Sequence, residues 1–414
     1  MKSRWSAWTG VLLLVAVNGA MAADIEAAPG KGTISAALAK AKRGDTVKLA
    51  AGEYQDELKI PAGVSVVGAG LDKTKLTGTG HALVQVAGAN VTITGIELRP
   101  GETLERGVNS DSAVRVERCR FVKFPHGIAL MGAPLSDIIA CEFKDCDIGV
   151  RAIGKASPTV WGCRFEGGRL GVLAMDGAPY IRNNLFHNLD EGMRLGSEEM
   201  PIVRNNVFWK CRAHGVLVMT AGKMAIMEPS IRNNIFAECG DAVSGPADCM
   251  SGLSHALVFR SGDPPVHIEG EGAAFDLAAK HIGSADPGLK LDDDGTLIVK
   301  NADATRGKGV RLSDQAPGEK GDIGLTEGWN MPGCRLPAGV KLPPVRFSGP
   351  IFVANGVAEE YVYLASKGCK MEKQATGTTE GRQLDILSVT CDGKKRTWKF
   401  DIDRFFGEIG IAFE

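Results

Sequence analysis

The sequence predicts an all-β protein whose main body is a single-stranded parallel β-helix, followed by a small C-terminal β domain. Three observations carry this prediction: a unit of about 22 residues recurs along the chain, apolar residues alternate within it, and Gly is abundant while aromatic residues are scarce. The chain of 414 residues holds 53 Gly but only 15 Phe and 4 Tyr. Such a composition is typical of a turn-rich β protein.

Overall composition excludes two broad classes of protein. Hydrophobic residues make up 44% of the chain and charged residues 23%, which is too apolar for an intrinsically disordered protein. The formal net charge of -1 gives no general attraction to a polyanionic duplex, so we expect no nucleic-acid partner.

The first 22 residues predict a secretory signal peptide. Lys2 and Arg4 supply a positive start, the apolar run 11–17 follows, and residues 20–22 (Ala-Met-Ala) offer the small side chains that a signal peptidase reads. The apolar run is too short for a stable transmembrane helix. We therefore expect cleavage of residues 1–22, no integral membrane segment afterwards, and a periplasmic or secreted, extracellular protein.

The recurring unit is visible in the positions of one large apolar residue. Seven segments align, with steps of 23, 22, 22, 21, 22 and 28 residues between their ends. A Gly followed by an apolar residue comes after most of these ends, and a Pro precedes most of the next segments, so three landmarks share one period. The segments end at Leu98, Phe121, Phe143, Phe165, Phe186, Phe208 and Phe236.

Within each unit the pattern is strand, turn, strand. Ile181 and Phe186 flank a turn at Asn183-Asn184, and Met193 and Leu195 then lie two residues apart. The unit is too short for ankyrin or tetratricopeptide repeats and lacks the Leu frame of a leucine-rich repeat. Three short strands per unit close one coil, and the coils stack about 4.8 Å apart.

Stacking predicts ladders of like residues inside the coils. The six Phe residues form one expected column, and Ile181, Val203 and Ile231 form a second. Two residues before each Phe, we expect Asn side chains to bond to the backbone and to their copies in the next coil, and Cys to fill the same place as a small apolar residue. These positions hold Cys119, Cys141, Cys163, Asn184, Asn206 and Asn234.

Two stretches resemble the secreted right-handed β-helix proteins of the pectate-lyase-like superfamily. Residues 32–70 are similar to the N-terminal cap and first coils of that group, and residues 285–309 with 321–324 (Gly-Asp-Ile-Gly) are similar to its last coils and closing motif. The resemblance implies a right-handed helix over about residues 30–327. Thr33 is expected to cap a short helix that covers the open end of the solenoid.

Four segments follow from these patterns. We expect a signal peptide over 1–22, a β-helix with its cap over 23–327, a Pro-rich linker over 328–344, and an antiparallel domain of four or five strands over 345–414. Within the β-helix, a loop should protrude between Phe208 and Phe236, and residues 245–283 lose the landmarks and are expected to be irregular.

The resemblance implies chemistry on acidic polysaccharides, which needs an acid, a base and a cation facing the substrate carboxylate. The sequence has no Asp-Pro-His-Asp run of the mannuronan epimerases and no paired Asp constellation of the polygalacturonases. A charged solvent-facing rim is the alternative for the catalytic candidates, which fall after the Phe landmark on adjacent coils: Asp190, Glu191, Arg194, Arg212 and His214.

No metal or cofactor site is assigned. Residues 292–295 (Asp-Asp-Asp-Gly) are compatible with Ca²⁺ but lack the spacing of an EF-hand loop, so a turn is expected there. The resemblance extends to periplasmic copper-delivery β-helix proteins, and Met131, Met175 and Met219 recur at one coil position. Ile153 and Gly196 occupy that position on intervening coils, which favours a packing stripe over a ligand row.

A row of basic residues is the sharper candidate for binding. The position four residues before the Phe follows an apolar position, so it should face outwards and be exposed. Three guanidinium groups one strand spacing apart repel one another unless an anion lies along them. We therefore expect a strip for an acidic polysaccharide or cell-envelope glycan, formed by Trp161, Arg182, Arg204 and Arg232. Mutual stacking and local ion pairs are the alternative.

Two disulfides are expected in an exported chain: Cys211 with Cys239 on consecutive coils, and Cys369 with Cys391 in the C-terminal domain. For the whole protein, the sequence favours an exported β-helix that binds an acidic polysaccharide. It leaves open whether the protein also acts on the glycan as a lyase, hydrolase or epimerase. A non-catalytic cell-envelope or surface scaffold and a periplasmic copper-handling accessory protein are the alternatives.

Overall fold

The computed structural model describes two parts of the chain. The main part covers residues 22–132, 136–196, 201–219, 229–250, 252–269, 275–291 and 297–304, and the C-terminal part covers 347–348, 351–353, 369–379, 382–391 and 394–401. The predicted signal peptide up to residue 21, the predicted linker and the predicted loop at 220–228 lie outside the described residues. No helix among these ranges is long and apolar enough to span a membrane.

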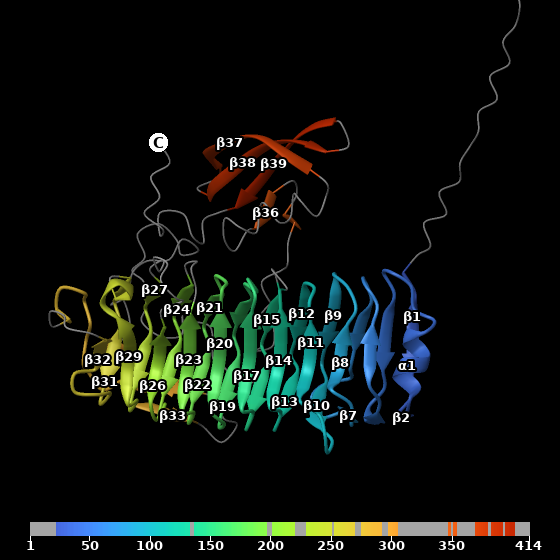
Figure 1. Ribbon diagram of the computed structural model, residues 1–414, viewed down its shortest axis with the longest axis horizontal. Coiled ribbons are helices and arrows are strands. Elements are labelled where there is room, and N and C mark those ends of the chain that lie inside the picture. Colours follow the sequence, from blue (N-terminus) through green and yellow to red (C-terminus); the bar gives the residue numbers. More distant parts are fainter. Residues whose placement is uncertain are drawn as a thin grey trace, which may run out of the picture.

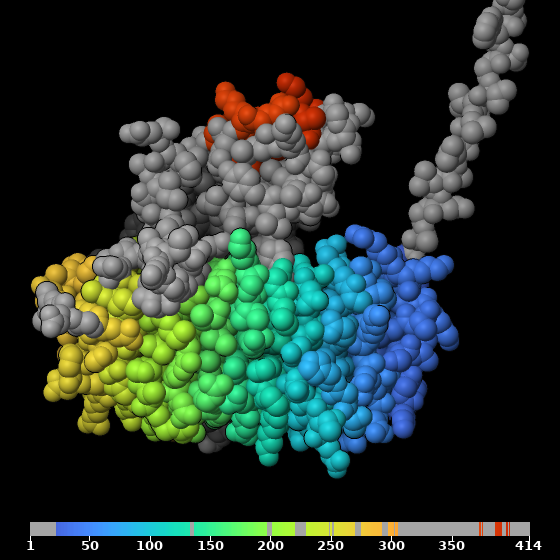
Figure 2. All heavy atoms as spheres, in the orientation of Figure 1, coloured from blue at the N-terminus to red at the C-terminus, as the bar shows by residue number. Residues whose placement is uncertain are grey.

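The main part is a parallel solenoid of three sheets, named sheets A, B and C here (Figure 1). The first coil contributes strands to sheets A and B only, and each later coil contributes one strand to each sheet, so from β3 onwards every third strand along the chain is a hydrogen-bonded neighbour. Figure 2 shows the successive coils as consecutive bands of colour along an elongated body.

Sheet A contains 11 strands in parallel register. In spatial order they are β1 (Asp24–Ala27), β3 (Thr46–Leu49), β6 (Ser65–Val67), β9 (Val91–Thr94), β12 (Val114–Glu117), β15 (Asp137–Ile139), β18 (Thr159–Trp161), β21 (Tyr180–Arg182), β24 (Ile202–Arg204), β27 (Ser230–Arg232) and β30 (Leu253–Ser254).

Sheet B also contains 11 strands. They are β2 (Gly30–Lys31), β4 (Gly52–Gln55), β7 (Thr74–Gly78), β10 (Glu97–Pro100), β13 (Arg120–Val122), β16 (Glu142–Lys144), β19 (Arg164–Glu166), β22 (Leu185–His187), β25 (Val207–Trp209), β28 (Ile235–Ala237) and β31 (Leu257–Phe259).

Sheet C contains 10 strands. They are β5 (Leu58–Ile60), β8 (Ala82–Val86), β11 (Arg106–Ser110), β14 (His126–Met131), β17 (Ile148–Ile153), β20 (Leu170–Met175), β23 (Glu191–Gly196), β26 (His214–Val218), β29 (Asp241–Pro246) and β32 (Val266–Glu269).

The predicted Phe column is confirmed. Neighbouring rings from Phe121 to Phe236 are stacked, with centroids 4.7–5.0 Å apart and planes within 7° of parallel. Each ring packs on a Gly backbone of the preceding coil; a Cβ added at Gly171 would lie 2.6 Å from Cδ1 of Phe186. The Gly landmark of the repeat is therefore explained by the Phe column, because a side chain at that position would occupy the space of the ring.

The Asn ladder is confirmed as well. Oδ1 of Asn206 accepts from the backbone N–H and the Nδ2 of Asn184, both at 3.0 Å, and Nδ2 of Asn206 donates to the Ile181 carbonyl at 3.0 Å. Asn234 repeats the pattern towards Asn206. Just before each ladder member, Asn183 and its counterparts have φ near +55°, which Asn tolerates better than most residues. The second apolar column, from Ile181 through Val203 to Ile231, is also in register and fully buried.

Helix α1 (Thr33–Leu38) closes the N-terminal end, as predicted. Its apolar face buries Ile34, Ala37 and Leu38. The prediction for Thr33 is wrong, because Gly32 in the left-handed conformation is the N-cap and no side chain caps the helix. Asp56 of the next coil instead accepts from the backbone N–H of Ser35 at 2.9 Å.

The C-terminal end of the solenoid differs from the sequence-based prediction in two ways. Residues 253–269 are not an irregular excursion but add one more coil through β30, β31 and β32, separated from β29 by the short 3-10 helix η1 (Ala247–Cys249). Residues 285–291 and 297–304 do not form parallel coils. They contain the antiparallel hairpin β33 (Leu289–Leu291) and β34 (Leu297–Val299), followed by η2 (Ala302–Ala304).

This hairpin packs on the outer face of sheet B. Leu297 and Ala304 join a separate apolar cluster with Leu185, Val207 and Ile235 of sheet B, and Leu289 and Leu291 lie against its edge. At this outward-facing position the earlier coils carry charged residues such as Arg164, whereas these coils carry apolar residues. The hairpin packs on this apolar surface. The predicted closing motif at 321–324 lies outside the described residues.

The C-terminal part forms a five-stranded sheet in the order β35-β36-β39-β38-β37. It stands on the side of the solenoid that carries sheet A (Figure 1). The pairs are antiparallel except β36 with β39, which is parallel. The strands are β35 (Phe347–Ser348), β36 (Ile351–Val353), β37 (Cys369–Thr379), β38 (Arg382–Cys391) and β39 (Lys394–Asp401).

The buried Cys residues of the solenoid are thiols. They include Cys119, Cys141 and Cys163 of the ladder position, and burial raises the pKa of Cys119 well above its usual range. The predicted Cys211–Cys239 disulfide is wrong. The two thiols interact by a hydrogen bond, which together with burial raises the pKa of Cys211.

Replacing Asn206 with Ala should lower the free energy of unfolding by about 2–4 kcal/mol, because two donors of Asn184 and the Ile181 carbonyl lose a buried partner. Urea denaturation followed by circular dichroism measures this. The control is Cys141→Ala at the same ladder position, where the side chain makes only weak sulfur hydrogen bonds and a smaller loss is expected. An equal loss of stability in both variants would contradict the stabilising role of the Asn206 hydrogen bonds.

Cys369 and Cys391 are direct cross-strand partners in β37 and β38. This register is compatible with the predicted disulfide, which stays a prediction. Peptide mapping without reduction should find this pair, while Cys119, Cys141 and Cys163 are alkylated after unfolding. Reduction should lower the free energy of unfolding of the C-terminal sheet by about 3 kcal/mol, because the disulfide restricts the unfolded chain between the two Cys residues. Alkylation of Cys369 without reduction would refute the pair.

Candidate functional site

The predicted basic row exists on the outer face of sheet A. Trp161, Arg182, Arg204 and Arg232 are successive register partners from β18 to β27, each next to an inward-facing residue. Arg204 donates from Nη2 to Oγ of Ser230 at 3.1 Å. The stacking inferred from the sequence is therefore correct.

The predicted exposure of this row is wrong. Arg204 is only 1% exposed and Arg182 only 9%, while Trp161 and Arg232 are partly exposed. Burial extends to neighbours on the same outer face, including Tyr180 and Ile202. The face of sheet A is thus not an open strip, and a glycan would reach only the two ends of the row.

The catalytic candidates lie together at the start of the sheet C strands and in the turns before them. Glu191 and His214 are register partners on adjacent coils, as the repeat predicts. Four of the five candidates form two ion pairs: Nε of Arg194 with Oε2 of Glu191 at 2.9 Å, and Nε of Arg212 with Oδ1 of Asp190 at 2.6 Å. Nδ1 of His214 lies 3.1 Å from Oδ2 of Asp241, which the sequence did not single out. Their assignment as catalytic residues stays a prediction.

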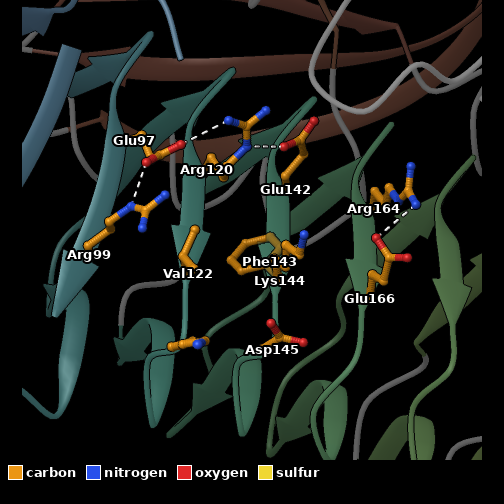
Figure 3. A pocket seen from close by; sticks show the side chains of 11 residues that line it. Glu97, Arg99, Arg120, Val122, Glu142, Phe143, Lys144, Asp145, Arg164 and Glu166 are labelled. Atoms are coloured by element: carbon orange, nitrogen blue, oxygen red, sulfur yellow. Dashed lines mark hydrogen bonds and ion pairs between the residues drawn. The ribbon is translucent and has the colours of Figure 1, made fainter. Parts of the chain in front are cut away.

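A groove of about 650 Å³ lies on the outer face of sheet B, on the coils before the hairpin (Figure 3). Two parallel rows of outward-facing residues line it, and turn residues form one side. The first row is Glu97, Arg120, Glu142 and Arg164, and the second is Arg99, Val122, Lys144 and Glu166.

Charges alternate along the first row. Figure 3 shows Arg120 between the carboxylates of the flanking coils: its Nη1 donates to Oε2 of Glu97 at 2.8 Å, and its Nε donates to Glu142. Nε of Arg99 donates to the other oxygen of Glu97 at 2.6 Å. Burial raises the pKa of Glu97, but these hydrogen bonds outweigh it and hold the pKa below its usual value. Glu97 is therefore a fixed anion rather than a proton carrier.

Glu166, a further carboxylate of the groove, is also engaged. Nη2 of Arg164 donates to Oε2 of Glu166 at 2.8 Å, and Nδ1 of His187 lies 3.5 Å from Oε1. The interaction with His187, reinforced by Arg164, lowers the pKa of Glu166. His187 in turn packs against the ring of Trp209, 4.6 Å between centroids.

Two cations of the groove remain available to a ligand. Lys123 and Lys144 are exposed, and neither makes an ion pair with a carboxylate of the described residues. Lys123 occupies the turn after β13 with φ of 60°, which directs the chain around the rim of the groove. The groove thus combines neutralised acids with unpaired ammonium groups.

Within the described ranges, no group of three or more His, Cys, Asp or Glu side chains could hold a metal ion. The predicted Ca²⁺ segment 292–295 lies outside them. Met131 is exposed and its register partner is Ile153, whereas the Met175 thioether lies over Gly196, close to Met219. Titration of the reduced protein with Cu(I) would test the copper-handling alternative directly.

The sheet B groove was missed at the sequence level, although a signal was present. The position directly before each Phe reads Arg120, Glu142 and Arg164 on successive coils, an alternation of sign at the strand spacing.

The comparisons with known proteins fit the fold. Residues 76–236 match the family described as "Right handed beta helix region". With the parallel three-sheet solenoid, this makes the chain a right-handed parallel β-helix protein, as the resemblance implied. No curated protein matches the chain.

Among solved structures, the chain is similar to a PL6 family alginate lyase, AlyGC, at 14% identity and a TM-score of 0.35, covering 83% of this chain. It spans only 63% of that enzyme's length. A pectin methylesterase in complex with a hexasaccharide matches at 12% identity and a TM-score of 0.22, with 66% of this chain and 81% of the other covered.

Replacing Glu97 with Gln should lower the free energy of unfolding near pH 7 by about 1.5–3 kcal/mol, because Arg99 and Arg120 lose a charged acceptor. Since the folded-state pKa is lowered, this stabilisation is present above the ordinary value of 4.5 and is lost as the pH falls below it. The parent and variant curves should therefore converge in acid.

Denaturation between pH 3 and 8 measures this convergence. The control is Glu53→Gln on the same sheet, whose exposed carboxylate makes only a long ion pair of 3.7 Å with Lys75 and should matter little at any pH. A Glu97→Gln loss that does not depend on pH would exclude the charge as its cause.

Proposed function

We propose that this protein is exported to the periplasm or the extracellular space and binds an acidic polysaccharide in the groove on sheet B. The observation that carries the proposal is the exposure of the Lys123 and Lys144 ammonium groups, neither ion-paired within the described part of the chain, in a groove that follows the stacked coils. The signal-peptide pattern of residues 1–22 supports export.

The charge inventory of the groove favours an anionic ligand. Its lining holds five basic and four acidic side chains, and three of the acids are bonded to Arg. Neutralised in this way, Glu97, Glu142 and Glu166 repel an incoming carboxylate far less than free carboxylates would. The Lys side chains then provide the local positive field.

The geometry of stacking favours a polymer over a small anion. Rows of the groove repeat at the strand spacing of about 4.8 Å, so equivalent side chains are offered at regular intervals along the solenoid axis. A linear chain with a carboxylate or sulfate on each sugar presents charges at intervals of similar order and can make several weak contacts at once.

Binding, rather than turnover, is the activity that this groove supports best. A general base must accept a proton readily, but Arg and His partners lower the pKa of Glu97 and of Glu166 and occupy their oxygens, which makes both carboxylates weak bases. A non-catalytic cell-envelope or surface protein that attaches to a glycan is consistent with this arrangement. Lyase, hydrolase or epimerase activity remains an alternative proposal, tested by incubation with the same glycans.

The double variant Lys123→Ala/Lys144→Ala should bind polygalacturonate or alginate at least tenfold more weakly, the effect of two lost charge-assisted contacts. Affinity electrophoresis and titration calorimetry measure this, with neutral dextran as the ligand control. Binding by the parent should also weaken from 50 to 300 mM salt, because the contacts are exposed. The matched control is Lys40→Ala/Lys59→Ala, which removes two exposed Lys outside the groove.

The same experiment separates the groove from the row on sheet A. Arg232→Ala removes the partly exposed end of that row and should leave binding unchanged if the groove is the site. Binding that survives in the double Lys variant but is lost in Arg232→Ala would refute the groove and favour the strip at Trp161, Arg182, Arg204 and Arg232. Absorbance of a new double bond in the ultraviolet would reveal lyase activity.

A further inference from the structure

A second cluster of positive side chains lies on the outer face of sheet C, away from the groove. It consists of Arg106 in β11, His126 in β14 and Arg151 in β17, on three consecutive coils. None of the three makes an ion pair with a carboxylate of the described residues. Other outward-facing Arg residues do so, including Arg99, Arg115, Arg120, Arg164, Arg169, Arg194 and Arg212.

The register brings the three side chains together. His126 is the direct partner of Arg106, and Arg151 is the partner of Ala129, three residues after His126. Side chains three residues apart meet on this face, since Nη1 of Arg106 donates to Oδ1 of Asn109 at 3.1 Å. Ala129 is small and fully buried, and the charges of Arg151 and Arg106 both act on the His126 ring to lower its pKa.

Neighbouring groups hold the cluster in place without neutralising it. Nδ2 of Asn109 donates to Oε1 of Gln85 at 2.8 Å, so the amide oxygen that receives Arg106 is itself fixed. The nearest carboxylates are occupied elsewhere: Glu105 lies 3.2 Å from Nδ1 of His81. Asp147 takes two hydrogen bonds from Arg169, at 2.9 and 3.0 Å.

Two polar atoms in the cluster lack a partner. Nε of Arg106 and Nδ1 of His126 are buried and make no hydrogen bond. A buried polar atom without a partner costs free energy, so hydrogen bonding within this cluster is incomplete among the described residues. All three residues are nevertheless partly exposed, so a ligand can reach their other atoms.

We propose that Arg106, His126 and Arg151 form an oxyanion-binding site on sheet C, for a carboxylate or a sulfate ester carried by a glycan chain. Two guanidinium groups on either side of the imidazole can each offer parallel N–H donors to one planar or tetrahedral anion. This site is separate from the sheet B groove and does not depend on it.

The state of the imidazole gives the site a measurable signature. Burial, followed by the charges of Arg151 and Arg106, lowers the pKa of His126, against the smaller opposing effects of Asp147 and Glu105. The ring is therefore neutral at pH 7 in the free protein. An anion between the two Arg residues screens their charge and favours the protonated ring, so binding should raise this pKa, and affinity should rise as the pH falls.

The test is titration of the full-length mature protein with sodium sulfate, galacturonate monomer and a galacturonate oligomer, followed by the ring resonances of His126 in NMR spectra. We expect an upward shift of the His126 pKa in the parent. Arg151→Leu, which copies Leu173 at the same position one coil later, should reduce affinity at least tenfold and abolish the shift. The control is Arg194→Leu in the same row, whose guanidinium is already bonded to Glu191.

The outcomes separate the sources of the anion. A shift of the His126 pKa with the oligomer, at concentrations where sulfate and the monomer cause none, identifies a glycan as the ligand. An equal shift with all three probes identifies a site for small free anions and would overturn the glycan assignment. No shift with any probe, or an equal loss in Arg194→Leu, would overturn the site itself. The Lys123→Ala/Lys144→Ala variant should retain the His126 response, which keeps this test distinct from that of the groove.

Discussion

Parallel in-register stacking of the coils is the constraint on which the rest of this structure depends. Backbone hydrogen bonds hold each strand about 4.8 Å from its copy, so every side chain lies directly above the residue that occupies its place in the previous coil. Inside the solenoid this favours identical residues. The Phe rings stack face to face, and Asn184, Asn206 and Asn234 bond both to the backbone and to one another.

Outside the solenoid the same constraint has a different consequence for charges. Like charges at one position would lie one strand spacing apart and repel, and the outer faces respond in three ways. On sheet B the sign alternates, so that Arg120 is held between two Glu residues. On sheet A the Arg row is withdrawn from solvent, with Arg204 bonded to Ser230. On sheet C, Arg106 and Arg151 are separated by a neutral His and are left without carboxylate partners in the described part of the chain.

These three arrangements of charge determine how strongly each outer face attracts an anionic ligand. A surface whose charges are satisfied internally offers shape but little attraction, whereas unpaired cations supported by a rigid sheet attract an anion at small entropic cost. The sheet B groove combines both features, since neutralised acids line it while Lys123 and Lys144 have no carboxylate partner among the described residues. The hairpin β33–β34 packs on the apolar coils of the same face and leaves the charged coils open.

The sequence by itself determined the repeating architecture, because the repeat is local. Phe121 to Phe236 recur at nearly constant steps, and each step must return the chain to the same point of the coil. The ladder residues and the direction of alternate side chains follow from that period. The capping helix was also visible from the apolar spacing of Ile34, Ala37 and Leu38.

Only the tertiary structure decided which outer rows are open and which side chains pair. An outward-facing position such as Arg204 is exposed or buried according to what packs on the sheet, and nothing within its own repeat specifies that. Ion pairs such as Arg120 with Glu97 join residues 23 apart in the chain, so they become contacts only once the register is fixed. The hairpin at 289–299 was equally hidden, because its apolar residues resemble another coil until the antiparallel pairing turns them onto sheet B.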